Sequence, residues 1–99
     1  MKVINLHQEE NKIIQLAVEN NRQAQQKIYA QFSSKMLSVC RQYIKDIHQA
    51  EDVMITAFMK VYSNLRNFEH KGSFEGWIRR IMVNECISFI RVQKKSYVS

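Results

Sequence analysis

The sequence predicts an all-α fold, a compact bundle of four to five helices. Apolar residues recur every three to four positions along nearly the whole chain, which is the spacing of one face of a helix. The chain has no proline and only two glycines, Gly72 and Gly76, so little interrupts this pattern. A chain of 99 residues without a linker-like or low-complexity segment is long enough for one small domain only. We therefore expect a single domain over residues 1–99, with its core between about residues 8 and 95.

Three helices are expected in the first half of the chain. The first covers about residues 8–19 and the second residues 22–31, with either of the two asparagines between them as the N-cap of the second. A third helix, capped by one of two adjacent serines, ends near Ile44. The side chains expected on the inner faces of these helices are Ile13, Leu16, Ala17, Ala24, Ile28, Tyr29, Met36, Leu37, Cys40, Tyr43 and Ile44.

A fourth helix has an unusually broad apolar surface. Asp46 begins a sequence that resembles a capping box and opens this helix, which continues to about Leu65. Apolar residues cover well over half of its circumference, whereas an ordinary surface helix has a narrower stripe. The extra flank contains Ile55, Met59 and Tyr62. Two interpretations stay open: this flank packs on a second neighbour inside the bundle, or it binds a partner protein.

A loop and a last helix complete the fold. Residues 67–72 lack helical periodicity and are expected to form the loop, after which Ser73 is a good N-cap for a helix that ends near Lys95. The spacing of Phe74 and Trp77 favours positions in the core over roles as stacking platforms for bases. The core face expected for this helix consists of Phe74, Trp77, Ile78, Ile81, Met82, Phe89 and Val92.

The charge of the chain points to a polyanionic partner. Fifteen Lys and Arg residues against nine Asp and Glu residues give a net charge of +6, and the sequence pI is about 9.6. The excess is concentrated in the last third of the chain, where one stripe of the last helix is mostly cationic or polar. Periodicity alone fits a solvated helix face as well as a binding surface. The residues of this stripe are Arg80, Asn84, Ile87, Arg91 and Lys94.

No set of residues indicates catalysis or a metal site. The carboxylates are scattered, there is no phosphate-binding loop, and no Ser/His/Asp or Cys/His arrangement stands out, so the protein is not expected to be an enzyme or to need a cofactor. Cys40 and Cys86 are far apart in helical segments and are expected to be small buried apolar residues. His7, His48 and His70 lack partners at metal-ligand spacing and are expected at the surface or at caps. No apolar run is long enough to span a bilayer, and the N-terminal stretch lacks the continuous apolar segment expected of a secretory signal.

Several motifs together resemble region 2 of the sigma-70 family of transcription initiation factors, and specifically its short extracytoplasmic-function (ECF) group. They are AED at residues 50–52, GSF at residues 72–74 and the frame W-I-x-R-I-x-x-N from Trp77 to Asn84. Phe58, the Val61-Tyr62 pair and Phe68 also fit the family pattern. The resemblance covers about residues 8–95 and implies a bacterial cytoplasmic protein.

The resemblance implies two binding surfaces. In the family the AED-led helix docks on the clamp coiled coil of the largest RNA polymerase subunit, and an anti-sigma factor can use the same surface. The loop and last helix bind the melted non-template strand of the promoter minus-ten element, with one base flipped into a pocket. Carried over to this chain, the clamp contacts are Asp52, Ile55, Thr56 and Met59; base capture draws on Phe68, Lys71, Gly72, Ser73, Phe74 and Asn84; and the phosphate contacts are Arg80, Arg91, Lys94 and Lys95.

The chain also departs from the family pattern. Ile55-Thr56 stands where a Gln-Glu pair is common, so clamp docking is expected to be more apolar. Gln25 replaces a usual Phe, and Gly76 stands where primary sigma factors place the first of two adjacent Trp residues. The C-terminal promoter-reading domain of the family is absent from these 99 residues, which are expected to be a piece of a longer protein.

Two other functions stay open. The first is a helical protein-interaction module without base-specific DNA binding, in which the cationic stripe is only solvated. The second is a duplex-DNA reader with a recognition helix in the major groove, but no short helix-turn-helix spacing with a tight glycine turn precedes the Trp77 helix.

Overall fold

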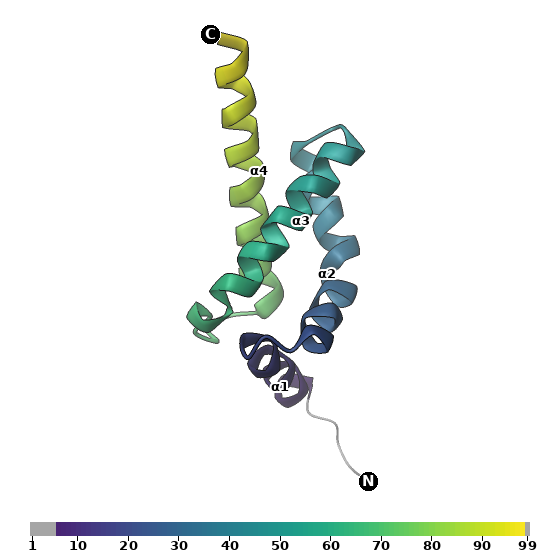
Figure 1. Ribbon diagram of the computed structural model, residues 1–99, viewed down its shortest axis with the longest axis vertical. Helices are drawn as coiled ribbons and strands as arrows, with labels where there is room; N and C mark the ends of the chain where they lie inside the picture. Colours follow the sequence, from purple (N-terminus) through teal and green to yellow (C-terminus); the bar gives the residue numbers. More distant parts are fainter. Residues whose placement is uncertain (1–5, 99) are drawn as a thin grey trace.

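Four α-helices and one short 3₁₀ helix make up the fold (Figure 1). The computed structural model describes residues 6–98, and the burial of side chains over residues 8–95. The predicted surface position of His7 therefore lies outside the described side chains. The elements are α1 (Leu6–Val18), α2 (Arg22–Tyr43), α3 (Ile47–Asn64), η1 (Leu65–Asn67) and α4 (Phe74–Val98). The predicted all-α fold is confirmed, and no strand occurs within residues 6–98.

The helix α2 is continuous where two helices were expected. A break was expected at Ser33 and Ser34, but Ser38 Oγ donates to the backbone oxygen of Ser34 at 3.3 Å inside an unbroken helix. The reason is tertiary packing: buried side chains continue on one face through both serines, with Phe32 before them and Met36 after them. The energy of this buried stripe outweighs the weak helix-breaking tendency of serine.

The N-caps agree with the predictions. Asn21 Oδ1 accepts a hydrogen bond from the backbone N–H of Ala24 at 2.9 Å, and Asp46 Oδ1 accepts one from Gln49 at 3.0 Å. Ser73 Oγ accepts from the backbone N–H of Gly76 at 2.9 Å and so begins α4. The end of α4 was misjudged, because the helix continues past Lys95 to Val98.

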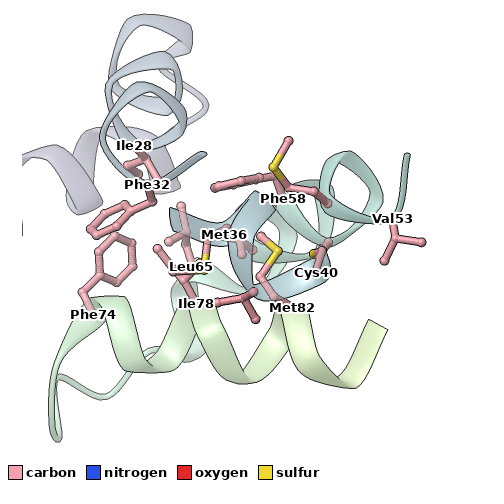
Figure 2. Packing of buried hydrophobic residues seen from close by; sticks show 14 of the residues in the cluster. Ile28, Phe32, Met36, Cys40, Val53, Phe58, Leu65, Phe74, Ile78 and Met82 are labelled. Carbon is pink, nitrogen blue, oxygen red and sulfur yellow. The ribbon is translucent and has the colours of Figure 1, made fainter. Parts of the chain in front are cut away.

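The core lies between α2, α3 and the first half of α4, with α1 and η1 closing one end (Figure 1). Figure 2 shows Phe32 of α2 facing Phe74 of α4, and Met36, Leu65, Ile78 and Met82 packed together beside them. Four residues predicted for inner faces are instead substantially exposed, namely Leu16, Tyr29, Tyr43 and Val92. Two of them lie near helix ends: Tyr43 is the last residue of α2, and Val92 lies beyond Cys86, the last buried residue of α4 up to residue 95.

The broad apolar flank of α3 is partly buried and partly exposed, so each of the two interpretations holds for some of its residues. Tyr62 packs inside the bundle, and its hydroxyl donates to the backbone oxygen of Gln25 at 3.0 Å. Ile55 and Met59 remain 50% and 65% exposed, respectively. Only the latter two are therefore available to a partner.

Two buried thiols join α2 to α4 at the centre of the core. Cys40 and Cys86 are both free and fully buried. Burial, reinforced by a hydrogen bond with Cys86, raises the pKa of the Cys40 thiol to about 12, and burial also raises the pKa of Cys86. Burial, and to a lesser degree the nearby Tyr29, raises the pKa of the Tyr62 hydroxyl to about 12.

These shifts predict that the domain loses stability in alkali. Because the pKa of Cys40 is higher in the folded state than its ordinary 9.0, its contribution to stability is complete below about pH 9 and is lost as the pH rises towards about 12. The thermal unfolding midpoint, measured by circular dichroism, is expected to fall steadily between pH 9 and pH 11. Cys40→Ala should flatten this fall, and a midpoint that stayed constant over that interval would contradict the prediction.

Candidate nucleic-acid interface

The loop between η1 and α4 reverses the chain so that α4 runs back along α3 (Figure 1). The backbone N–H of Phe68 bonds to the oxygen of Leu65 at 3.1 Å and ends η1. Two residues then adopt the left-handed conformation, His70 at φ 60° and Gly72 at φ 80°. A Cβ at Gly72 would meet nothing within 4 Å, so the backbone angle, not lack of space, explains the glycine.

An aromatic cluster anchors this loop. The ring centroid of Phe68 lies 5.2 Å from those of both Phe74 and Trp77, and Phe74 lies 5.7 Å from Phe32 of α2. Phe68 and Phe74 are buried, and Trp77 is partly buried. Phe74 and Trp77 therefore occupy the core positions that their spacing favoured. Phe74 is only 2% exposed, so any contribution of its ring to base capture would come through the shape of the loop, whereas Phe68, 7% exposed, also lines a hollow beside the loop.

The polar part of the loop faces solvent. Lys71, Gly72 and Ser73 are exposed, and Lys71 Nζ lies 3.5 Å from Oε2 of Glu69, which is also exposed. An ion pair this exposed contributes little to stability and leaves the lysine free to exchange partners. Backbone and cation are thus accessible together at the tip of the loop.

Asn84 lies on the same side of α4 as Ser73 but far along the helix. It follows Ser73 by eleven residues. This separation corresponds to about 16 Å along the axis and a rotation of only about 20°. The residues predicted for base capture therefore fall into two places, the loop and the third turn beyond it. One base in contact with Ser73 does not reach Asn84, whereas a strand lying along α4 would reach both with different nucleotides.

The predicted phosphate contacts form an exposed stripe on α4. Arg80, Arg91, Lys94 and Lys95 are all exposed, and none of them forms an ion pair within the described part of the chain. We define Arg80, Asn84, Arg91, Lys94 and Lys95 as the α4 stripe. It carries four positive charges and one amide on a single helix.

A long-range ion pair beside this stripe was not expected from the sequence. Lys60 Nζ of α3 lies 2.5 Å from Glu85 Oε2, the residue next to Asn84. The Glu85 side chain is only 17% exposed and pairs with Lys60, so the lysine compensates its negative charge next to the stripe. Local periodicity carries no signal for such a pair, because its partners are 25 residues apart.

The predicted clamp contacts share one face of α3. Asp52, Ile55, Thr56 and Met59 are exposed and follow the i, i+3, i+4, i+7 spacing of one helix face. Tyr29 of α2 stands across an open groove of about 330 Å³ that Ile55 also lines. We define Asp52, Ile55, Thr56 and Met59 as the α3 face.

No group of three or more possible metal ligands occurs among the residues that the structure describes. Within the same residues, no helix combines the length and apolar character needed to cross a membrane.

The chain is similar to known proteins in sequence. The Sigma-70 region 2 family model matches residues 28–96. The ECF RNA polymerase sigma factor SigW of Bacillus subtilis (strain 168) is 32% identical over 66 residues, which cover 67% of this chain and 35% of SigW. A probable RNA polymerase sigma factor of Haemophilus influenzae is 32% identical over 68 residues, which cover 69% of this chain and 34% of that protein.

A solved structure shares the fold. The NMR structure of an engineered region 2 of sigmaE in complex with GTAAAA has a TM-score of 0.84, covers 97% of this chain and 100% of its own, and is 20% identical. The chain spans about a third of the length of the curated relatives. Because the family model matches more than half of the chain, and the fold agrees, the chain belongs to the sigma-70 region 2 family.

Proposed function

We propose that this domain takes part in bacterial transcription initiation by binding core RNA polymerase and the melted non-template strand of the promoter minus-ten element. The observation that carries the proposal is the α4 stripe, whose four exposed cations begin about two helical turns after the exposed glycine loop. Cations hold phosphates without regard to sequence, whereas loop backbone and amide groups read base edges. The domain performs no catalysis and acts in the cytoplasm.

Similarity supports the nucleic-acid part of the proposal. The related fold of engineered sigmaE region 2 was solved in complex with GTAAAA. An extended single strand along α4 would place its phosphates on the cations of the stripe, one base at the loop and another at Asn84. The mostly buried Glu85, paired with Lys60, would repel such a strand little.

The α3 face is proposed as the polymerase contact, and an anti-sigma factor would compete for it. Ile55 and Met59 are large apolar side chains that stay exposed in the isolated domain, which supports a partner on this face. Since Ile55 and Thr56 replace a polar pair common in the family, burial of apolar area would supply more of the binding energy.

A single binding series tests the DNA part of the proposal. Fluorescent single strands containing GTAAAA, their complement and the duplex are titrated with the 99-residue chain at two salt concentrations. The GTAAAA strand is expected to bind most tightly. Equal affinity for all three would overturn base recognition and favour the protein-interaction module, which the exposed Ile55 and Met59 support. A preference for the duplex would favour a major-groove reader.

Two substitutions separate base reading from phosphate binding. Asn84→Ala is expected to reduce the preference for GTAAAA by about 1–3 kcal/mol without changing the salt dependence. Arg80→Ala is expected to weaken binding to every strand and to lower the slope of log K against log salt by about 1. Lys27→Ala removes the same charge from an exposed site on α2 and is the matched control. An unchanged slope for Arg80→Ala would remove Arg80 from the phosphate contacts.

A further inference from the structure

A second hollow lies beside the loop and is lined by none of the residues of the α4 stripe. It is an open cleft of about 420 Å³ bounded by α1, η1 and the first half of the loop. Its volume lies in the range of about 300–1,000 Å³ that is usual for sites binding small molecules. None of the residues assigned above to base capture lines it except Phe68.

The floor of the cleft is apolar and formed by core residues. Ile14 of α1, Leu65 of η1 and Phe68 form it, and each of these side chains is less than 10% exposed. They belong to the main core, so the floor does not depend on the loop alone. An apolar floor of this kind provides a surface for the face of a planar ring.

The rim of the cleft is polar, and none of the residues that line it is acidic. Asn11 and Gln15 stand one helical turn apart on α1 and are exposed, so their amides offer donors and acceptors to the same space. Arg66 adds a guanidinium on the η1 side. Amides that pair with base edges and a cation that pairs with a phosphate are therefore arranged around one apolar floor.

The cleft also adjoins the proposed path of the strand. The ring of His70 lies 4.6 Å from that of Phe68, centroid to centroid, and both residues line the cleft. Lys71 to Ser73, the exposed tip of the loop, follow immediately in the sequence. A strand that contacts the tip of the loop thus has its next nucleotides within reach of the cleft.

From these observations we infer that the cleft binds one further unstacked nucleotide of the same single strand, outside the segment that lies on α4. The base lies on the floor of Ile14, Leu65 and Phe68, its edge bonds to Asn11 and Gln15, and Arg66 holds its phosphate. This inference rests on the proposed function, since it requires that the domain bind a single strand at all.

The experiment compares GTAAAA with strands extended by three nucleotides at either end, using the 99-residue chain. One of the two extensions is expected to increase affinity at least about fivefold, from the stacking of one base. An abasic site scanned through that extension should abolish the gain at a single position. If an abasic site at every position leaves the gain in affinity intact, or if it abolishes the gain equally at all three positions, the inference is overturned.

Variants assign the gain to the cleft. Gln15→Ala and Arg66→Ala are expected to remove most of the gain from the extension while leaving the affinity for GTAAAA itself unchanged. Gln23→Ala changes an exposed amide on α2 and should leave the gain intact. All of these positions are exposed, so an unchanged melting temperature will show that each variant is folded.

The outcomes distinguish the two proposals. If the wild-type chain binds no single strand, the proposed function fails. If it binds GTAAAA but gains nothing from either extension, or if Gln15→Ala and Arg66→Ala keep the full gain, only the inference about the cleft fails. Asn84→Ala should weaken binding to GTAAAA and keep the gain, because Asn84 does not line the cleft.

Discussion

Replacing Phe74 with alanine is expected to lower the free energy of unfolding by about 3–5 kcal/mol, the usual cost of removing a large side chain from a core. Phe74 is only 2% exposed, and its ring meets those of Phe32, Phe68 and Trp77. In a domain of this size each kcal/mol shifts the melting temperature by about 4–8 °C. Thermal or urea unfolding should therefore show a fall of about 12 °C or more.

The expected loss of stability of Phe74→Ala also affects its DNA binding. A loss of DNA binding by Phe74→Ala would follow from unfolding and would not show a contact with a base. Ile55→Ala, at an exposed site, should change stability by no more than about 0.5 kcal/mol and serves as the control. A melting temperature of Phe74→Ala within 2 °C of wild type, a margin of roughly half a kcal/mol, would show that the ring is not packed as described.

Replacing Met59 with glutamate is expected to weaken binding to core RNA polymerase about tenfold or more. Met59 is 65% exposed on the α3 face, and a charge there would have to be buried without a partner in an apolar interface. Glutamate is a good helix former, so α3 itself should be little affected. Affinity is measured with purified core polymerase by fluorescence anisotropy of the labelled domain.

Val92 provides a matched control for Met59. It is also 65% exposed but lies on α4, outside the α3 face. Val92→Glu introduces the same charge and should bind polymerase with nearly wild-type affinity. If both variants lose affinity equally, the effect is one of net charge; if neither does, the α3 face is not the polymerase contact.

Some features of α4 could be predicted from local sequence patterns and others could not. Its beginning at Ser73 was predictable, because the N-cap bond from Gly76 to Ser73 involves neighbours in the sequence. The exposure of the cationic residues was also predictable from their spacing on one face. The exposure of Val92 was not, because it depends on where α3 stops covering α4.

The candidate site also combines features that local sequence predicts with features that depend on contacts between distant segments. The residues of the α4 stripe could be read from the helical period. The pairing of Lys60 with Glu85, and the cleft formed by α1 and η1, join segments that are distant in the sequence. The separation of Asn84 from the loop follows from the rise of the helix between them. A motif match places these residues in one site because they are close in sequence order, and it does not take this rise into account.

The helical class, the three N-caps and the basic character of the last helix follow from the amino-acid sequence, because periodicity, capping and charge act within a few residues. The tertiary structure decided the rest. It joined two expected helices into α2 by burying Phe32 and Met36 on either side of the serines, turned Tyr62 inward and left Ile55 and Met59 exposed. Burial depends on which distant helix covers a side chain, and that information is not contained in any local stretch of the chain.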